Sequence, residues 1–337
     1  MNYITYERDS STYTPLVSIV LLVYNGEKYI QECAFAVKAQ IYSHIEVVVV
    51  DNASTDRGMQ ILKSTYPNWI YIQHKDNLGF AAGMNSGLEI ARGDYVVPLN
   101  QDVYLDCNFI DKCVNIMEAL PGAGALGAEE YLWENGKRTD ELRTLGSALF
   151  LRLRIKGVWL KIVAPVAASF GVNGSFPFLR REALFELKTR DGHVYDPAFF
   201  SGWEDMDLWW RMQLRGWECF ATRETKAWHV GSSFDAEKQS FLQKSTFYQC
   251  WVMRNRWFLI LKNIPLFLLL FLSPLLLLLE FILPFYFLLR SPRSLRAWLN
   301  SWREIIMSLP AIFEKRRIIQ RDRKLSSLQI MRWFKAI

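Results

Sequence analysis

The chain of 337 residues contains few cysteines, and their spacing excludes the usual cysteine-based frameworks. No two of its five cysteines form a CxxC pair, so neither a zinc ribbon nor a disulfide-stapled secreted fold is indicated. Free buried thiols in a reducing cytoplasm are expected instead. The first 13 residues contain no apolar run that would act as a secretory signal. We therefore expect this first part of the chain to stay on the cytoplasmic side.

Motifs for nucleic-acid binding are also lacking, although the net charge is +6. The positive charge is confined to the C-terminal end of the chain. From Phe285 onward, 12 Lys and Arg residues stand against 3 Asp and Glu residues, while the preceding part has a small negative balance. A basic end beside apolar sequence indicates an anionic membrane surface as partner and no nucleic acid.

Short apolar runs alternate with helix-like stretches in the first hundred residues. The runs are rich in β-branched residues, as in strands buried on both faces, and occupy Leu16–Tyr24, Ile45–Val50, Ile70–Gln73 and Asp94–Leu99. The helix-like stretches are Glu27–Gln40, Thr55–Ser64 and Ala81–Ala91. This alternation predicts an α/β fold with an open sheet that binds ligands at the carboxyl ends of its strands. Loops and short elements are expected over 132–165.

Polar residues follow the first two runs, at the edge where a ligand is expected. The first run ends in Tyr24 and is followed by Asn25 and Gly26. The tyrosine ring can stack on a base, although an ordinary turn would by itself account for these residues. Asp51 ends the second run. Its carboxylate can accept hydrogen bonds from a base or a ribose, or serve only the cap of the next helix.

Glycines and a carboxylate follow next. Gly79, Gly83 and Gly87 open a helix, where the backbone can approach a phosphate or sugar. Their spacing of four does not match GxGxxG, so a dinucleotide-binding fingerprint is not supported. The fourth run ends in Asn100-Gln101-Asp102, which suits a hard divalent cation carried on a diphosphate, although a turn has the same composition.

Acidic residues lie among aromatic ones in the segment 199–215. Glu204, Asp205 and Asp207 fall within four residues, beside five Phe and Trp residues. Apolar neighbours raise the pKa of a carboxyl group, which suits a general base, and we prefer this interpretation to a helix start that merely favours acids. Farther on, the imidazole of His229 can complete a metal shell begun by Asp102, although a lone histidine is more often structural.

Together these segments resemble glycosyltransferase family 2, the inverting transferases of the GT-A fold, and especially the rhamnosyltransferase-type members that build bacterial surface polysaccharides. The resemblance covers residues 16–235. It rests on the ordered segments VSIVLLVYNGEKYI, VVVVDNASTD, NLGFAAGMNSGL, GDYVVPLNQDV, FFSGWEDMDLWWRMQLRGW and KAWHVGSS. It implies an enzyme that uses Mg²⁺ or Mn²⁺ and moves one sugar from a dTDP-, UDP- or GDP-sugar to an acceptor.

The resemblance also implies a role for each matching residue. The nucleotide sugar would be held by Tyr24, Asn25, Asp51, Asn77, Gly79, Asn85, Asn100 and Gln101. Asp102 and His229 would bind the metal, and Asp205 in the Glu204-Asp205 pair would be the catalytic base. Such an enzyme works by one in-line displacement, with no covalent intermediate.

Two departures from the family's pattern matter. Asn100 replaces the first carboxylate of the DxD motif, which predicts weak metal affinity without bound donor, and the QxxRW signature of processive members is missing. Single-sugar addition is therefore favoured. Two alternatives remain open: a sugar-phosphate nucleotidyltransferase, which normally has a Gly-rich basic loop after its first strand, and a catalytically inactive GT-A membrane scaffold, which would be expected to lose Asp102 or Asp205.

The last third of the chain is first apolar and then basic. Ile264–Leu289 has a single charge, Glu280, and is long enough to span a bilayer. Its prolines and the basic residues on both flanks favour instead a helical hairpin that dips into one leaflet and turns near Pro274. Lys262 is one of those flanking residues. The segment Leu295–Phe334 has the composition of an interfacial amphipathic helix; the alternative is a buried helix pair in a soluble domain.

The predicted organisation is thus a GT-A domain over residues 1–250 and a helical membrane-associating region over 251–337. On the cytoplasmic face of the cell membrane, this arrangement would present the active site to a lipid-linked acceptor such as a polyprenyl-diphosphate sugar.

Overall fold

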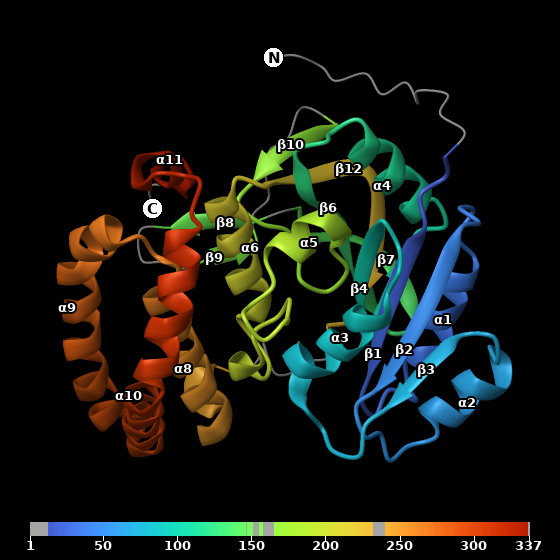
Figure 1. The fold of residues 1–337 in the computed structure, drawn as a ribbon. Helices are drawn as coiled ribbons and strands as arrows, with labels where there is room; N and C mark the ends of the chain where they lie inside the picture. The colour runs from blue at the N-terminus through green and yellow to red at the C-terminus, as the bar shows by residue number, and fades with distance from the viewer. Residues whose placement is uncertain (1–12, 146, 151–154, 158–164, 232–239, 336–337) are drawn as a thin grey trace.

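The computed structural model of the protein describes residues 13–145, 147–150, 155–157, 165–231 and 240–335 (Figure 1). The segment searched for a secretory signal therefore lies almost wholly outside the described residues, as do Ser232 and Ser233 of the last motif. The strands of the large sheet are β1 (Val17–Val23), β2 (Ile45–Asp51), β3 (Ile70–Gln73), β4 (Tyr95–Asn100), β5 (Val103–Leu105), β6 (Ala123–Glu134), β7 (Lys137–Thr144), β10 (Val166–Ser169), β11 (Phe178–Arg180) and β12 (Glu218–His229). A small second sheet contains β8 (Ser147–Phe150), β9 (Ile155–Gly157) and β13 (Phe334–Lys335).

The large sheet is open and mixed, with the order β10-β12-β6-β11-β4-β1-β2-β3. Strands β4, β1, β2 and β3 are parallel, whereas β11 runs antiparallel to both β4 and β6. The helices of this part are α1 (Ile30–Lys38), α2 (Gly58–Thr65), α3 (Gly79–Ile90), α4 (Phe109–Glu118), α5 (Arg181–Glu186) and α6 (Glu204–Arg215). They lie on both faces of the sheet (Figure 1). The predicted α/β fold is confirmed.

Alternate side chains of the parallel strands enter two different cores, as the strand period of two requires. Val20 of β1 belongs to the cluster that includes Met84 of α3. Its neighbour Leu21 belongs to the cluster that includes Ile30 of α1. Because both faces are covered, β1 is buried over all seven of its residues, which explains the continuous apolar run in the sequence.

The prediction of loops and short elements after residue 132 is wrong at its beginning. Strands β6 and β7 form a long antiparallel hairpin there. Its two-residue turn is Asn135-Gly136, and both residues have positive φ, +52° and +74°. Asn-Gly is the preferred sequence for such a turn because both positions must be left-handed. The Asn-Gly pair could therefore have predicted the hairpin, whereas the polar composition of the segment indicated loops.

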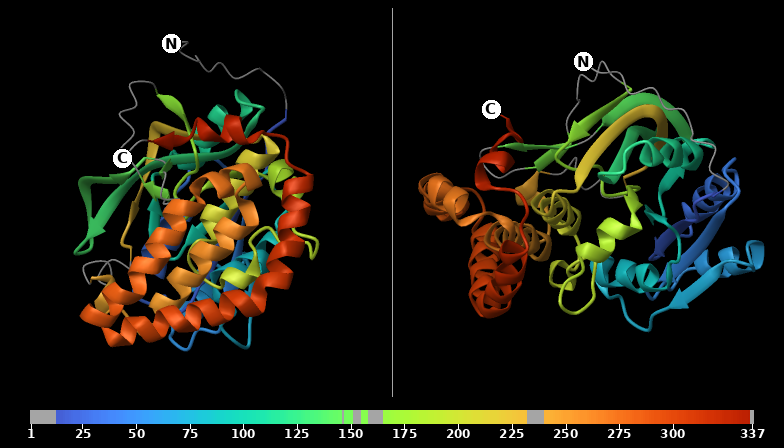
Figure 2. Two further views of the ribbon diagram at one scale, coloured as in Figure 1. Left: turned by 90° about the vertical axis from the view of Figure 1, so that its left-hand side faces the viewer. Right: turned by 45° about the horizontal axis from the view of Figure 1, so that its top comes forward.

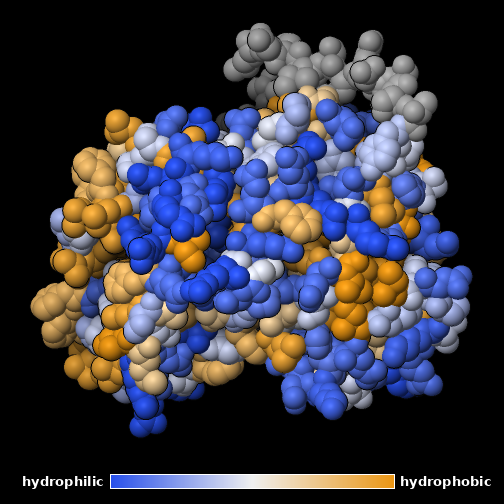
Figure 3. All heavy atoms as spheres, in the orientation of Figure 1, coloured by the Kyte–Doolittle hydropathy of each residue, from blue (hydrophilic) through white to orange (hydrophobic). Residues whose placement is uncertain are grey.

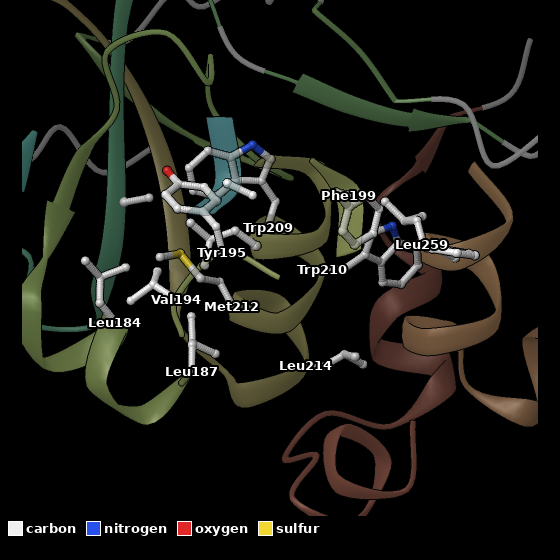
Figure 4. Packing of buried hydrophobic residues seen from close by; sticks show 14 of the residues in the cluster. Leu184, Leu187, Val194, Tyr195, Phe199, Trp209, Trp210, Met212, Leu214 and Leu259 are labelled. Atoms are coloured by element: carbon white, nitrogen blue, oxygen red, sulfur yellow. The ribbon is translucent and has the colours of Figure 1, made fainter. Parts of the chain in front are cut away.

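The C-terminal part consists of helices. They are α8 (Thr246–Asn263), α9 (Leu266–Arg290), α10 (Pro292–Arg321) and α11 (Ser327–Met331), and the first three lie side by side over one side of the molecule (Figure 2). Two of them, α8 and α10, contact α6. Trp210 of α6 packs with Phe199 and with Leu259 of α8 in one continuous core (Figure 4). The predicted domain boundary at residue 250 thus falls inside α8, and the division into two domains stays a prediction.

Helix α9 is one continuous helix of 25 residues, so the predicted hairpin with a turn at Pro274 is wrong. A proline inside a helix removes the hydrogen bond to the carbonyl four residues earlier. For Pro274 that carbonyl belongs to Leu270, and it accepts a hydrogen bond from the Ser273 hydroxyl instead, at 2.8 Å. This substitute donor allows the helix to pass through the proline.

Lys262 does not lie at a lipid headgroup, contrary to the expectation for a flanking basic residue. It is 1% exposed, and its Nζ lies 2.6 Å from Asp196 and 2.8 Å from Asp207. Asp207 also binds Arg211, and Asp196 binds Lys315 of α10. A buried lysine needs such anionic partners; Lys262 therefore joins α8 to α6 and to Asp196.

Candidate active site

A cavity of about 380 Å³ opens at the carboxyl ends of β1, β2 and β4. Six of the residues predicted to bind the nucleotide sugar or its metal line it: Tyr24, Asn77, Gly79, Asn100, Gln101 and Asp102. Leu22, Asn52, Phe80, Phe200 and Ser201 complete the wall. Segments far apart in the sequence thus meet at the edge where an open α/β sheet binds its ligands.

Three residues predicted to bind the nucleotide sugar do not line this cavity, and each has other contacts. Asp51 is buried, and its Oδ1 accepts the Ser54 N–H at 2.8 Å. The Asn25 Oδ1 accepts the Thr55 N–H at 2.8 Å, so both side chains shape the turn after β2. Asn85 uses its amide on the backbone of Tyr195, with contacts of 2.7 and 2.9 Å. The roles predicted for these residues in ligand binding stay predictions.

Asn52 is a residue of the cavity that the sequence reasoning missed. Its Nδ2 donates to Asn77 Oδ1 at 2.9 Å and to the Gly79 carbonyl at 3.1 Å, and its Oδ1 accepts the Leu78 N–H at 3.0 Å. One buried amide thereby fixes the backbone of the loop 77–79. The only sequence signal for it is its place directly after Asp51, at the end of a buried strand.

Asp102 forms a buried chain with His229 and Glu130. His229 Nε2 lies 3.3 Å from Asp102 Oδ1, and His229 Nδ1 lies 2.8 Å from Glu130 Oε1. Burial lowers the pKa of His229, but the hydrogen bonds to Asp102 and Glu130 outweigh it and raise the pKa to about 9. Glu130, which the sequence reasoning also missed, therefore orients the imidazole so that Nε2 faces Asp102, a residue of the cavity wall.

Asp102 and His229 suit a divalent cation bound together with a diphosphate. A carboxylate oxygen and an imidazole nitrogen are both ligands that Mn²⁺ accepts, and the pair is already in contact. Among the described residues there is no group of three or more His, Cys, Asp and Glu side chains that would hold a metal by itself. Phosphate oxygens of a bound ligand would have to complete the shell, and the weak affinity expected from Asn100 stays a prediction.

Glu204 and Asp205 begin α6, and both have raised pKa values. Burial, with Asp205 as second cause, raises the pKa of Glu204 to about 8. Burial raises the pKa of Asp205 to about 6. Glu204 is buried, whereas Asp205 as a residue is half-buried. A group that is accessible and largely ionised at neutral pH is the better base.

Asp205 is tied to the end of β4 through residues 174 and 175. A Cβ on Gly174 would lie 2.5 Å from Asp205 Oδ2, so only glycine lets the chain pass this carboxylate. The next residue, Ser175, accepts the Asn100 N–H at 2.9 Å. The fold thereby brings Asp205 close to the segment Asn100–Asp102 that lines the cavity.

The turn that leads into α6 has a strained backbone. Phe200 has φ +59° and ψ −65°, and the Ser201 N–H donates to the Phe199 carbonyl at 2.7 Å, which is a γ-turn of the rare positive-φ type. Trp203 has φ +75°. Non-glycine residues in such conformations cost about 1–3 kcal/mol each, and they cluster at functional sites.

Gly79 is expected to be intolerant of a side chain because it packs against this turn. Its φ is +77°, and a Cβ would lie 2.6 Å from the Phe200 ring. We expect Gly79→Ala to lower the free energy of unfolding by about 1–3 kcal/mol and to weaken nucleotide binding. Gly136→Ala is the matched control, because φ there is +74° with nothing within 4 Å. Equal melting temperatures for the two variants would contradict the contact with Phe200.

Part of the chain is similar in sequence to known glycosyltransferases. Residues 18–164 match the sequence model of Glycosyl transferase family 2. An uncharacterized glycosyltransferase of Rickettsia bellii is 35% identical over 136 residues, which are 40% of this chain and 20% of the relative. One from Haemophilus influenzae is 33% identical over 106 residues, 31% of this chain and 42% of the relative. The chain thus spans well under half the length of these relatives.

Two solved structures share the fold at low sequence identity. GalNAc-T7 with UDP, GalNAc and Mn²⁺ has a TM-score of 0.54 and 15% identity, over 65% of this chain and 44% of that one. The mannosyltransferase PcManGT from Pyrobaculum calidifontis, in complex with GDP-Man and Mn²⁺, has a TM-score of 0.51 and 16% identity, over 88% of each chain. The protein therefore has the GT-A fold, and its residues 18–164 carry the sequence pattern of glycosyl transferase family 2.

Proposed function

We propose that the protein is a metal-dependent, inverting glycosyltransferase that moves one sugar from a nucleoside-diphosphate sugar to a hydroxyl of an acceptor. The observation that carries the proposal is Asp102 in the cavity wall together with Asp205, whose pKa is raised to about 6, at the start of the helix that follows the lining residues Phe200 and Ser201. A candidate metal ligand thus lines the cavity, and a candidate base begins the helix next to it.

The reaction follows from these positions. Asp205 takes the proton of the acceptor hydroxyl as its oxygen bonds to the anomeric carbon. The bond from that carbon to the diphosphate breaks in the same step, and the nucleoside diphosphate leaves. A divalent cation, when bound, neutralises the charge of the leaving diphosphate. Asp102 and His229 would hold it, and a single displacement inverts the anomeric configuration.

The donor is proposed to be a dTDP-, UDP- or GDP-sugar, possibilities that a thermal-shift panel with Mn²⁺ separates. One nucleoside diphosphate is expected to raise the melting temperature in the presence of Mn²⁺ and much less in its absence. The resemblance of the motifs to rhamnosyltransferase-type members makes rhamnose the first sugar to test, in cell-surface polysaccharide synthesis. If no nucleoside diphosphate in the panel raises the melting temperature, the proposal of a nucleoside-diphosphate sugar as donor is contradicted.

A row of aromatic rings leads from the donor cavity toward α8 and α10, and it is an argument for an acceptor that extends in this direction. Phe200, which lines the cavity, lies 4.5 Å between ring centroids from Trp251, and Trp251 lies 4.0 Å from Phe247. Phe247 in turn lines a groove between α8 and α10 with a volume of about 520 Å³. Sugar rings and lipid chains both pack on such surfaces, so we propose a lipid-linked glycan, such as a polyprenyl-diphosphate sugar, as the acceptor.

Helix α9 is proposed to bind the membrane. It is the one described helix that is long and apolar enough to cross a bilayer, by length and composition. Only a narrow stripe, Leu268, Leu272, Leu276 and Phe287, is buried. The remaining apolar side chains form the hydrophobic edge of the molecule in Figure 3. So much exposed apolar surface argues against the buried helix pair of a soluble domain.

Glu280 attaches α9 to its neighbours along one side, which favours a helix lying in one leaflet over one crossing the bilayer. Its Oε1 accepts from Trp257 of α8 at 2.9 Å and pairs with Arg256 at 3.2 Å. Its Oε2 accepts from Trp298 and Trp302 of α10 at 3.0 and 3.3 Å. The proposed location is the cytoplasmic face of the cell membrane, with anionic lipids facing the basic residues of α10.

The membrane proposal predicts the effect of charges on the outer face of α9. The triple variant Leu270→Glu, Leu278→Glu and Phe285→Glu changes exposed residues only. It is expected to lower co-sedimentation with phosphatidylcholine–phosphatidylglycerol vesicles by more than about tenfold, because each buried apolar side chain contributes about 1.5–3 kcal/mol to insertion.

The control places three glutamates on exposed apolar residues elsewhere, Phe35, Ile41 and Phe185. This variant is expected to bind vesicles like the unchanged chain, and both triple variants are expected to keep its melting temperature. An unchanged chain that stays in the supernatant with vesicles present, and needs no detergent, would contradict membrane binding.

A further inference from the structure

Asn255 is a fully buried polar residue of α8 to which the proposed reaction gives no role. Its Nδ2 lies 2.9 Å from the carbonyl oxygen of Phe199 and 2.8 Å from that of Gly202, with the Ser201 carbonyl at 3.4 Å. An amide nitrogen carries two hydrogens, and the two short contacts use both.

These carbonyl groups belong to the strained turn that precedes α6. A backbone with positive φ at Phe200 and Trp203 persists only where its surroundings hold it. On the other side of the turn, the Phe200 carbonyl accepts the Ala81 N–H of α3 at 3.0 Å. The turn is therefore held between two helices, and α8 supplies its hydrogen bonds through a single side chain.

Arg254 fixes the orientation of the Asn255 amide. Its Nε and Nη2 lie 3.0 and 2.8 Å from Asn255 Oδ1, so the oxygen faces the guanidinium and the nitrogen must face the turn. Arg254 is itself anchored by Glu304 of α10 at 2.7 Å, and its Nη2 donates to the Ala198 carbonyl at 3.1 Å. Each polar atom of the Asn255 side chain thus has partners that prevent it from rotating.

We propose that Asn255 is a positioning residue: its amide holds residues 199–202 in the conformation that sets Phe200 in the wall of the donor cavity and Asp205 at the start of α6. Because α8 leads directly into α9, the helices that we place at the membrane also hold the turn that carries the base. The kinetic consequence rests on the proposed function, whereas the support of the turn does not.

Asn255→Leu and Asn255→Asp test this proposal in the full chain, purified in detergent. Leucine keeps a similar volume without a donor. Aspartate keeps the shape and the contact with Arg254 but turns an oxygen toward the carbonyl groups. Asn263→Leu is the matched control, because Asn263 is also fully buried in α8 but donates to the side chain of Asp207 at 2.7 Å, not to a carbonyl group of residues 199–202.

Hydrogen exchange of peptides covering 199–206 is the direct measurement. Both Asn255 variants are expected to exchange at least about tenfold faster there, while Asn263→Leu exchanges at the rate of the unchanged chain. With an acceptor, kcat for transfer is expected to fall about 10- to 100-fold in the Asn255 variants, because a misplaced base slows the reaction steeply. The Kd for nucleoside diphosphate is expected to change less than kcat, since most residues of the cavity wall belong to segments other than this turn.

Equal exchange over 199–206 in the Asn255 and Asn263 variants would overturn the proposal, as would a kcat that falls equally in both. If the unchanged chain transfers no sugar at all, the proposed function fails. Faster exchange confined to the Asn255 variants would still support the role of Asn255 in holding the turn.

Discussion

Replacing Asp205 with asparagine is expected to lower the rate of sugar transfer by about 10²–10⁴-fold and to leave nucleotide binding nearly intact. Asparagine has the same shape and can still accept the Met206 N–H, which lies 2.7 Å from Asp205 Oδ1. It cannot take a proton from the acceptor hydroxyl. Steady-state kinetics with the donor identified by the thermal-shift panel, together with calorimetry of nucleotide binding, measure the two effects separately.

Glu204→Gln is the control for this variant, because Glu204 is the neighbouring acid of the same helix start. Its pKa of about 8 keeps it protonated at neutral pH, so an isosteric amide is expected to change the rate less than about tenfold. A larger loss in Glu204→Gln than in Asp205→Asn would make Glu204 the base.

The pH profile gives a second check on Asp205. A base acts only when deprotonated, and burial raises the pKa of Asp205 to about 6. The rate is therefore expected to fall as the pH drops below about 6 and to level off above it. This acid limb is expected to be missing from the residual activity of Asp205→Asn.

Removing the divalent cation is expected to stop the reaction, and Mg²⁺ or Mn²⁺ to restore it. Charge stabilisation of the leaving diphosphate contributes several kcal/mol, so Asp102→Asn is expected to weaken Mn²⁺-dependent nucleotide binding by about 100-fold or more. His229→Gln is expected to weaken it less, because the imidazole brings no negative charge. Calorimetry with and without Mn²⁺ measures both effects, and full activity in excess chelator would remove the metal from the mechanism.

Glu130→Gln tests whether Glu130 orients His229 for metal binding. Loss of a partner that orients a ligating histidine typically weakens metal binding about 10- to 100-fold. Glu129→Gln is the matched control, since Glu129 is the adjacent acid of β6 and pairs with Arg223 instead, at 3.0 Å. Equal Mn²⁺ affinity in the two variants would contradict the role of Glu130.

The parallel half of the fold was predictable because three of its four strands, β1, β2 and β4, are largely buried on both faces. Burial on both faces forces continuous apolar runs, and the four runs correspond to β1, β2, β3 and β4 within one or two residues. Asn100-Gln101-Asp102 was predictable for the same reason, since the end of such a strand must lie at the ligand edge. Strand β7 was not predictable, because none of its residues is buried and its composition is that of a loop.

Other parts of the site depend on contacts that no local pattern records. Glu130 lies within a long strand, and its partner His229 is 99 residues away. Phe200 and Trp203 have positive φ although neither is glycine, because α3 and α8 hold their turn. The sequence predicts Lys262 to be a cation that flanks a membrane segment, whereas in the structure it is buried between Asp196 and Asp207. In each case a distant segment decides the conformation or the charge state.

The most direct test of glycosyl transfer is the identity of the phosphate product, followed by ³¹P NMR. With the nucleotide sugar selected by the panel, Mn²⁺ and a polyprenyl-diphosphate sugar as acceptor, the protein is expected to release nucleoside diphosphate and no pyrophosphate. The product is expected to have an anomeric configuration opposite to that of the donor. Release of pyrophosphate from a nucleoside triphosphate and a sugar phosphate would identify a nucleotidyltransferase. Tight nucleotide binding without any turnover would indicate an inactive scaffold, and either result would contradict glycosyl transfer.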